Sequence, residues 1–193
     1  MSELFEIPQN FKGTAWADDE KYQQMYRQSL ENPEAFWAEQ AERVDWFKKW
    51  DKVLDWNYHE ANIRWFEGGQ LNVSYNCLDR HLEKKGDQIA LIWEGDDPEE
   101  DRSFTYRELH EQVCRFANVL KQQGIEKGDR VMIYMPMVPE LAMACLACAR
   151  IGAIHSVVFG GFSAEALKSR IQDCGGKMTV SYTHLTLPTT SKV

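Results

Sequence analysis

The second half of the chain alternates short apolar segments with longer amphipathic ones, and this alternation constrains the fold more than any other feature. From Asp87 onward, apolar runs typical of strands lie at 89–93, 130–135, 154–159 and 177–180. Between them lie segments with the apolar spacing of helices, at 105–124, 139–152 and 163–173. This order predicts an α/β fold with a parallel sheet whose strands are joined by right-handed crossover helices.

Residues at the helix ends support these boundaries. Thr105 and Glu108 have the spacing of a capping box, which begins a helix. Pro139 suits the first turn of the next helix, and Gly152 suits its end. Ser163 is a suitable N-cap for the last helix.

The ends of two predicted strands are candidate binding edges, because ligands of parallel sheets bind beyond the carboxyl ends of the strands. The segments that follow these strands are Pro136–Pro139 and Phe159–Ser163. Glycine at 160 and 161 lets the backbone approach a ligand closely, and the helix that begins after Ser163 offers unpaired N–H groups to an anion. A plain turn followed by a helix cap accounts for the same residues.

The first part of the chain, to about residue 85, is aromatic and irregular, and it contains six of the seven tryptophans. Acidic residues that begin at Asp18 predict a helix there. Asn32 and Pro33 predict a second helix, whose apolar face continues to Phe47. We interpret this part as an extension that packs onto a larger body, since aromatic stripes usually serve packing.

Two shorter features are expected between this extension and the alternating region. Two strands are predicted between residues 63 and 75, around the glycine-containing turn at 67–70. A short helix is predicted over 77–85, and Gly86 is expected to end it in the left-handed conformation.

Charge argues against two classes of partner. The 22 basic and 30 acidic residues give a net charge of −8, which disfavours non-specific binding of nucleic acid or of an anionic membrane. The N-terminus carries acid where a signal peptide carries base, and no run of about 20 apolar residues follows. We therefore expect a cytoplasmic protein with neither nucleic acid nor membrane as partner.

The five cysteines are an odd number, which excludes a complete internal disulfide framework. The apolar neighbours of Cys77, Cys114 and Cys145 suit reduced, buried thiols. Cys145 and Cys148 are expected to be small residues on one helix face, because a zinc site needs about two more ligands. The sequence names no catalytic residue and no metal ligand. A structural role is the default for the scattered histidines at 59, 81, 110 and 155.

Several longer strings identify a family resemblance. They resemble, in order from about residue 22 to about residue 180, the N-terminal part of AMP-forming acetyl-CoA synthetases, within the acyl-adenylate-forming enzyme superfamily. The strings are FWAEQ at 36–40, NCLDRH at 76–81, IWEGDD at 92–97, YMPMVPE at 134–140, ARIGA at 149–153 and HSVVFGGFS at 155–163. Propionyl-CoA synthetases share most of them.

The resemblance implies a synthetase N-terminal extension over residues 1–85 and the first, incomplete part of the parallel-sheet AMP-binding domain over 86–180. It implies that the full-length enzyme converts acetate, ATP and CoA to acetyl-CoA, AMP and pyrophosphate through an acetyl-adenylate, with Mg²⁺. Phe159, Gly160 and Gly161 match a stretch that lies against CoA in the family. The ATP-phosphate loop and the C-terminal lysine of the family have no counterpart here, so we expect this fragment to be inactive and to bind no cofactor tightly.

The last residues, 181–193, depart from the family pattern and turn threonine-rich. The string from Val180 to Thr189 resembles the translation of a transposase-type sequencing adapter. We therefore expect a non-native tail fused to a truncated gene.

Three other functions remain open from the sequence. The chain is alternatively part of a propionyl-CoA synthetase, or a non-catalytic α/β module that holds a nucleotide or CoA. A third possibility is a partner-binding protein that uses its aromatic extension as a docking arm. The oligomeric state is not predicted.

Overall fold

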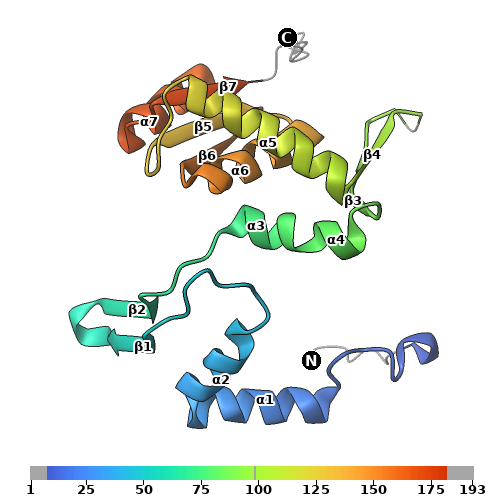
Figure 1. Ribbon diagram of the computed structural model, residues 1–193, viewed down its shortest axis with the longest axis vertical. Coiled ribbons are helices and arrows are strands. Elements are labelled where there is room, and N and C mark those ends of the chain that lie inside the picture. The colour runs from blue at the N-terminus through green and yellow to red at the C-terminus, as the bar shows by residue number, and fades with distance from the viewer. Residues whose placement is uncertain (1–7, 98, 182–193) are drawn as a thin grey trace, which may run out of the picture. The chain divides into compact units, whose positions relative to one another are not determined.

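The computed structural model describes residues 8–97 and 99–181. The chain divides into two compact units, Met1–Gln70 and Leu71–Val193 (Figure 1). Of the predicted non-native tail, only Ser181 falls within the described residues, where it ends the last strand, and the remainder lies outside them.

The N-terminal unit contains two consecutive helices. The first, α1, follows a short 3-10 turn, and Asp18 caps it by accepting a hydrogen bond from the backbone N–H of Lys21, as the acidic start predicts. The second, α2, begins at Pro33 as predicted but ends well before Phe47. The backbone N–H of Phe47 instead donates to the carbonyl of Gln70 at 2.8 Å, so this segment pairs in an extended conformation. The bounds are η1 Gln9–Phe11, α1 Asp19–Glu31 and α2 Pro33–Ala41.

The strands of this unit form an antiparallel hairpin, β1 Lys52–Asn57 and β2 Asn62–Glu67, joined by the 3-10 turn η2 Tyr58–Glu60. The prediction of two strands around 67–70 is wrong. The Asn57 side chain accepts hydrogen bonds from the backbone N–H groups of His59 and Glu60 and so fixes the turn there. The glycine-containing segment at 67–70 is a turn, but it follows β2 instead of joining two strands.

The second unit opens with three short helical segments, α3 Val73–Cys77, η3 Asp79–His81 and α4 Leu82–Lys85. The expected single helix over 77–85 is therefore replaced by η3 and α4. Gly86 has a right-handed conformation (φ −52°), which contradicts the predicted left-handed cap. Its carbonyl accepts a hydrogen bond from the backbone N–H of Arg107, in the first turn of the next long helix.

An antiparallel hairpin comes next, β3 Ile89–Glu94 and β4 Asp101–Thr105. Sequence analysis placed 89–93 as the first strand of the parallel sheet, and this is wrong: among the described residues β3 pairs with β4 alone. The partner strand escaped prediction because its sequence, DRSFT, has little apolar character.

The remaining elements form the predicted α/β arrangement. They are α5 Tyr106–Gln122, β5 Arg130–Met135, α6 Pro139–Ile151, β6 Ile154–Phe159, α7 Ala164–Cys174 and β7 Met178–Ser181. The strands form a parallel sheet in the order β6-β5-β7. Thr105 and Glu108 form the predicted capping box, and Gly152 ends α6 with φ +76°. The predicted α/β fold is confirmed.

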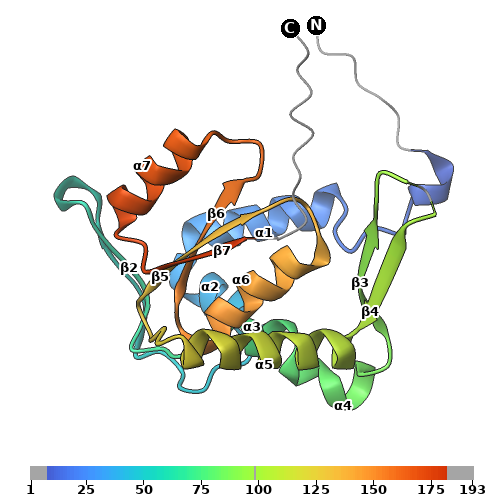
Figure 2. The same ribbon diagram turned by 90° about the horizontal axis from the view of Figure 1, so that it is seen from above.

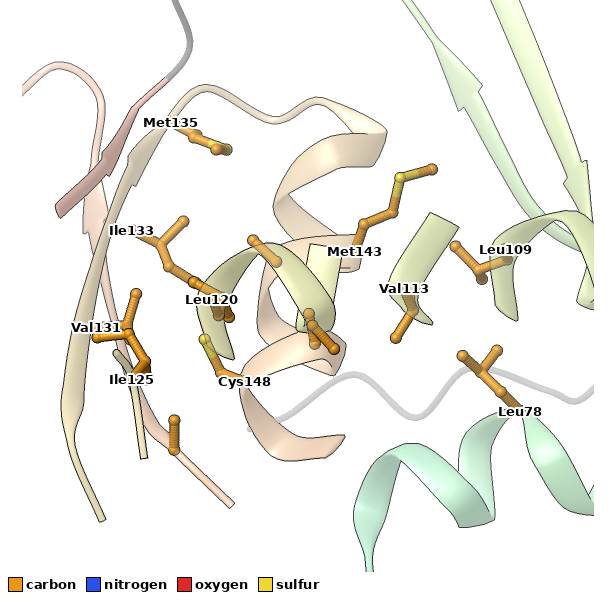
Figure 3. Packing of buried hydrophobic residues seen from close by; sticks show 14 residues of the cluster. Leu78, Leu109, Val113, Leu120, Ile125, Val131, Ile133, Met135, Met143 and Cys148 are labelled. Carbon is orange, nitrogen blue, oxygen red and sulfur yellow. The ribbon is translucent and has the colours of Figure 1, made fainter. Parts of the chain in front are cut away.

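The core lies between α5, α6 and one face of β5 (Figure 3). Helical spacing brings apolar residues of α5 and α6 onto facing sides, and alternate residues of β5 point toward them. The labelled core residues from these three elements are Leu109, Val113, Leu120, Val131, Ile133, Met135, Met143 and Cys148.

The opposite face of the sheet is covered by α7. Met132 alternates with the core-facing residues of β5 and is also fully buried, and its sulfur lies 3.4 Å from the Cys174 thiol at the end of α7. Figure 2 shows α7 across the sheet from α5 and α6. This cover is incomplete, because no residue of α7 is buried and Ile154 and Val157 of β6 are exposed.

Candidate functional site

The carboxyl ends of β5 and β6 meet at one edge, as predicted. The two strands run parallel, and their last residues, Met135 and Phe159, are register partners. The segments Pro136–Pro139 and Gly160–Ser163 therefore leave the sheet side by side, at the position where parallel sheets bind ligands.

The segment after β6 presents an exposed aromatic pair on a close-packed backbone. Phe159 is 62% exposed, and its ring meets that of Phe162 edge-on at 6.0 Å between centres. A Cβ atom at Gly160 would lie 3.4 Å from the carbonyl group of Met135. A Cβ at Gly161 would lie 2.7 Å from the Phe159 ring. A side chain at 160 would therefore make an ordinary contact with β5, whereas one at 161 would clash with the Phe159 ring in its present position.

Tyr134 holds this segment in place. Its hydroxyl lies 2.9 Å from the carbonyl oxygen of Gly160 and 3.0 Å from that of Phe162, so a single proton is shared between two acceptors. This role was not predicted from the sequence. A signal was present in the sequence. Tyr134 is the last residue but one of its strand, and the neighbouring parallel strand is followed by a glycine turn.

The start of α7 adds polar groups beside the aromatic pair. The Ser163 hydroxyl accepts a hydrogen bond from the backbone N–H of Ala166 at 3.3 Å, which confirms the predicted N-cap. The Arg170 guanidinium lies 5.2 Å from the centre of the Phe162 ring. A cation and an aromatic surface therefore lie next to the Phe159–Gly161 turn.

The other segment of the edge is held by the β3-β4 hairpin. The Trp93 indole N–H donates to the carbonyl of Met137 at 2.7 Å, and Arg102 donates two hydrogen bonds to Glu140 at 2.8 and 3.2 Å. Partial burial alone would raise the pKa of Glu140, but the hydrogen bonds from Arg102 outweigh it and lower that pKa. Sequence analysis assigned none of these three side chains, because the contacts join residues about forty positions apart.

An open cavity of about 370 Å³ lies at the same edge, between α5, α6 and β7. Met135 and Ser181, the last residues of β5 and β7, both line it. Most of its wall is apolar, from Phe116, Val119, Met143 and Val180. The edge therefore combines an apolar hollow with two tightly held loops.

The cysteines differ in environment. Burial raises the pKa of the Cys148 thiol to about 11, and the neighbouring Cys145 adds to the effect. Cys77 is exposed, contrary to expectation. Across residues 8–97 and 99–181, no three His, Cys, Asp or Glu side chains gather into a group that could hold a metal. No helix in the same residues is long and apolar enough to cross a membrane.

Comparison with known families gives two adjoining matches. The family described as "AMP-binding enzyme" matches residues 78–192. The family described as "Acetyl-coenzyme A synthetase N-terminus" matches residues 22–77. The second match contains most of α1, all of α2 and the hairpin of the N-terminal unit, and the first contains the whole parallel sheet.

Curated relatives are similar over most of the chain. The "Acetyl-coenzyme A synthetase" of Syntrophus aciditrophicus (strain SB) is 59% identical over 179 residues, which are 92% of this chain and 28% of the relative. The "Acetyl-coenzyme A synthetase 2" of Pseudomonas putida is 60% identical over 162 residues, 84% of this chain and 25% of the relative. The chain thus spans little more than a quarter of the length of these relatives.

Proposed function

The chain belongs to the family of AMP-binding enzymes, and we propose that it is the N-terminal part of an AMP-forming acetate–CoA ligase. The observation that carries this proposal is the adjoining pair of family matches, which meet between residues 77 and 78 without a gap. The reaction proposed for the whole enzyme joins acetate to AMP with release of pyrophosphate. It then transfers the acetyl group from AMP to the CoA thiol.

Within this proposal, the turn at Phe159, Gly160 and Gly161 lies against CoA. Three features support it. The Phe159 ring is mostly exposed at a strand end, and aromatic faces of this kind stack on purine rings. Glycine leaves the backbone open to close approach, and Tyr134 holds the turn in a single conformation, which lowers the cost of binding.

ATP and Mg²⁺ are proposed as ligands of the whole enzyme. The described residues bring together no group of side chains suited to Mg²⁺, so we assign no step through the metal to them. A cytoplasmic location is also proposed, since the five cysteines are free thiols, which suits a reducing compartment.

A chimera tests the role of the Phe159 turn. Residues 1–181 of this chain would replace the matching segment of the Syntrophus aciditrophicus relative. We expect the chimera to catalyse acetate-dependent exchange between ATP and pyrophosphate and to form acetyl-CoA. Phe159→Ala should raise the KM for CoA several-fold and leave the exchange reaction unchanged, because exchange does not involve CoA.

The matched control is Phe11→Ala, since Phe11 is exposed to a similar extent, at 60%, but lies in the N-terminal unit. It should change neither reaction. An equal loss in exchange and in acetyl-CoA formation with Phe159→Ala would refute the CoA assignment. A folded chimera without exchange activity would contradict the proposed enzyme.

A further inference from the structure

A cluster of four side chains lies outside the strand-end site and joins η3, α5 and α6. Asp79 accepts hydrogen bonds from both terminal guanidinium nitrogens of Arg150, at 2.7 and 2.8 Å. The Nε2 atom of His110 lies 3.2 Å from Asp79 Oδ1. These three side chains are 18–27% exposed. The carboxylate is therefore largely enclosed and holds both the guanidinium and the imidazole in fixed positions.

The fourth member is Cys114, one helical turn after His110 on α5. Its sulfur lies 3.5 Å from Nε2 and 4.0 Å from Nδ1 of the imidazole. The same Nε2 atom also lies 3.3 Å from a guanidinium nitrogen of Arg150, which can only donate a proton. The imidazole is therefore within reach of the thiol proton. A nucleophile, a base and a carboxylate that orients the base thus occur in sequence.

The thiol also opens onto a cavity with an excess of positive charge. The cavity has a volume of about 590 Å³, and Cys114 and Arg150 both line it. Two exposed lysines, Lys121 and Lys127, lie on its wall with a single carboxylate, Glu126. Within residues 8–97 and 99–181, neither lysine forms an ion pair or hydrogen bond through its side chain. The charge of Arg150 is paired with Asp79, so the two lysines exceed the single carboxylate of Glu126, and this excess favours a small anionic ligand.

We propose that Cys114 is a thiol–disulfide exchange site for small anionic disulfides. The disulfide enters the cavity with its negative groups toward Lys121 and Lys127. The Cys114 sulfur attacks one disulfide sulfur while its proton passes to the His110 imidazole. A bond forms between Cys114 and that sulfur, the original sulfur–sulfur bond breaks, and the other half leaves as a thiolate. The incoming disulfide is the oxidant, so electrons balance without a further reagent.

The other cysteines lack this combination: burial raises the pKa of the partly buried Cys145 thiol. Cys77 is exposed, but no histidine or lysine is seen hydrogen-bonded to it within the described residues. Cys148 is fully buried. Cys174 packs its sulfur against Met132. Exposure alone therefore predicts that Cys77 reacts first, whereas the cluster predicts Cys114, and the two expectations can be distinguished.

The test compares the thiols of the full 193-residue chain within one reaction. The folded chain is treated with dithionitrobenzoate, an anionic disulfide, and in parallel with dithiodipyridine, a neutral one. Tryptic peptides separate Cys77, Cys114 and Cys174 from one another, because arginine or lysine flanks each segment. Mass spectrometry then gives the rate at each site. We expect Cys114 to react about tenfold faster than Cys77 with the anionic reagent, and the advantage to fall with added salt.

Two sets of variants identify the cause. The double variant Lys121→Gln/Lys127→Gln should slow the anionic reagent several-fold at Cys114 and leave the neutral reagent unchanged. The matched control Lys84→Gln/Lys85→Gln removes the same charge from α4, outside the cavity, and should have no effect. His110→Gln should slow both reagents. The lysine variants alter only exposed side chains, so they keep the proposal testable if His110→Gln fails to fold.

The proposal is overturned if Cys114 reacts no faster than Cys77 in the chain under native conditions. It is also overturned if the advantage persists in concentrated urea, because local sequence would then be the cause. An equal effect of the two lysine double variants would likewise contradict it, since the cavity would then have no specific part in the reaction.

Discussion

The hydroxyl of Tyr134, near the end of β5, lies 2.9 Å from the carbonyl oxygen of Gly160, in the turn after β6. A strand side chain thereby holds the backbone of a loop that follows a neighbouring strand. The same hydroxyl reaches the carbonyl of Phe162, so both ends of the turn around Gly161 are attached to one group. The conformation of the proposed CoA-binding turn thus depends on β5.

Tyr134→Phe should destabilise the second unit by about 1 kcal/mol, because the partly buried carbonyl of Gly160 and the exposed carbonyl of Phe162 lose their donor. Urea titration followed by circular dichroism measures the change. Tyr58→Phe is the control, since Tyr58 is 74% exposed and lies in the N-terminal unit. Equal, negligible effects of the two substitutions would show that the Tyr134 hydroxyl does not hold the turn.

Thr105→Ala should cost about 1 kcal/mol, the usual value for loss of an N-cap, because the capping box of α5 is complete. Thr105→Ser keeps the hydroxyl and should retain most of the stability. If Thr105→Ser loses as much stability as Thr105→Ala, the methyl group of Thr105 and not its hydrogen bond is the source of the stabilisation.

The capping box also predicts a pH dependence. The backbone N–H of Thr105, and then its hydroxyl, lower the pKa of Glu108 below the ordinary 4.5. The charged form of Glu108 is favoured in the folded state. This stabilisation is therefore present at pH values above the pKa of Glu108 in the unfolded chain, and it is lost as the pH falls through the lower pKa of the folded state. Glu108→Gln should therefore reduce the fall in stability between neutral and acidic pH, which is measured as the change in the urea midpoint over that pH range. An equal fall in the urea midpoint for wild type and Glu108→Gln would contradict a stabilising role of charged Glu108.

Asp79→Asn should destabilise the second unit by about 2 kcal/mol or more at neutral pH, because the partly buried Arg150 loses its carboxylate partner. Burial alone would raise the pKa of Asp79, but the hydrogen bonds and charge of Arg150, followed by His110, lower it. The stabilisation is therefore present above the unfolded pKa of about 4 and is lost as the pH falls below it.

Urea titrations of wild type and Asp79→Asn should accordingly converge in acid. The control Asp87→Asn removes an aspartate whose side chain is 92% exposed, and it should have an effect below about 0.5 kcal/mol. A difference between wild type and Asp79→Asn that stays constant down to low pH would exclude the ion pair as its source.

The parallel-sheet region could be predicted from sequence because its signals are local. Thr105, Pro139, Gly152 and Ser163 each act within one helical turn, and apolar periodicity gave the strands between them. The expectation that Phe159 and the following glycines lie at a strand end beside Pro136 followed from the parallel topology alone. The register between β5 and β6 confirms it.

The features that escaped prediction depend on contacts between distant residues. The strand at 89–94 pairs with β4 and not with the parallel sheet. This could not be predicted, because the sequence of β4 shows little strand character. The end of α2 depends on the pairing of Phe47 with Gln70. The cluster of Asp79, His110 and Arg150 assembles residues from three elements, so scattered histidines gave no sign of it.

The 193-residue chain by itself should show no acetate-dependent exchange between ATP and pyrophosphate, because its sequence contains no glycine-rich phosphate loop followed by lysine. Exchange of labelled pyrophosphate into ATP is the appropriate assay, with the Syntrophus aciditrophicus relative as positive control. Exchange above the background of a vector-only preparation would refute the expectation.

The most direct test of the proposed function is the activity of the complete enzyme read from the source DNA. Sequencing across codon 181 defines the native reading frame, and the encoded protein is assayed for AMP release with CoA and either acetate or propionate. The account predicts a frame that continues into a glycine-rich loop and a distant lysine, and AMP release that depends on acetate and exceeds that with propionate. A native stop directly after Val193, or a folded full-length enzyme that releases no AMP with acetate, would contradict it.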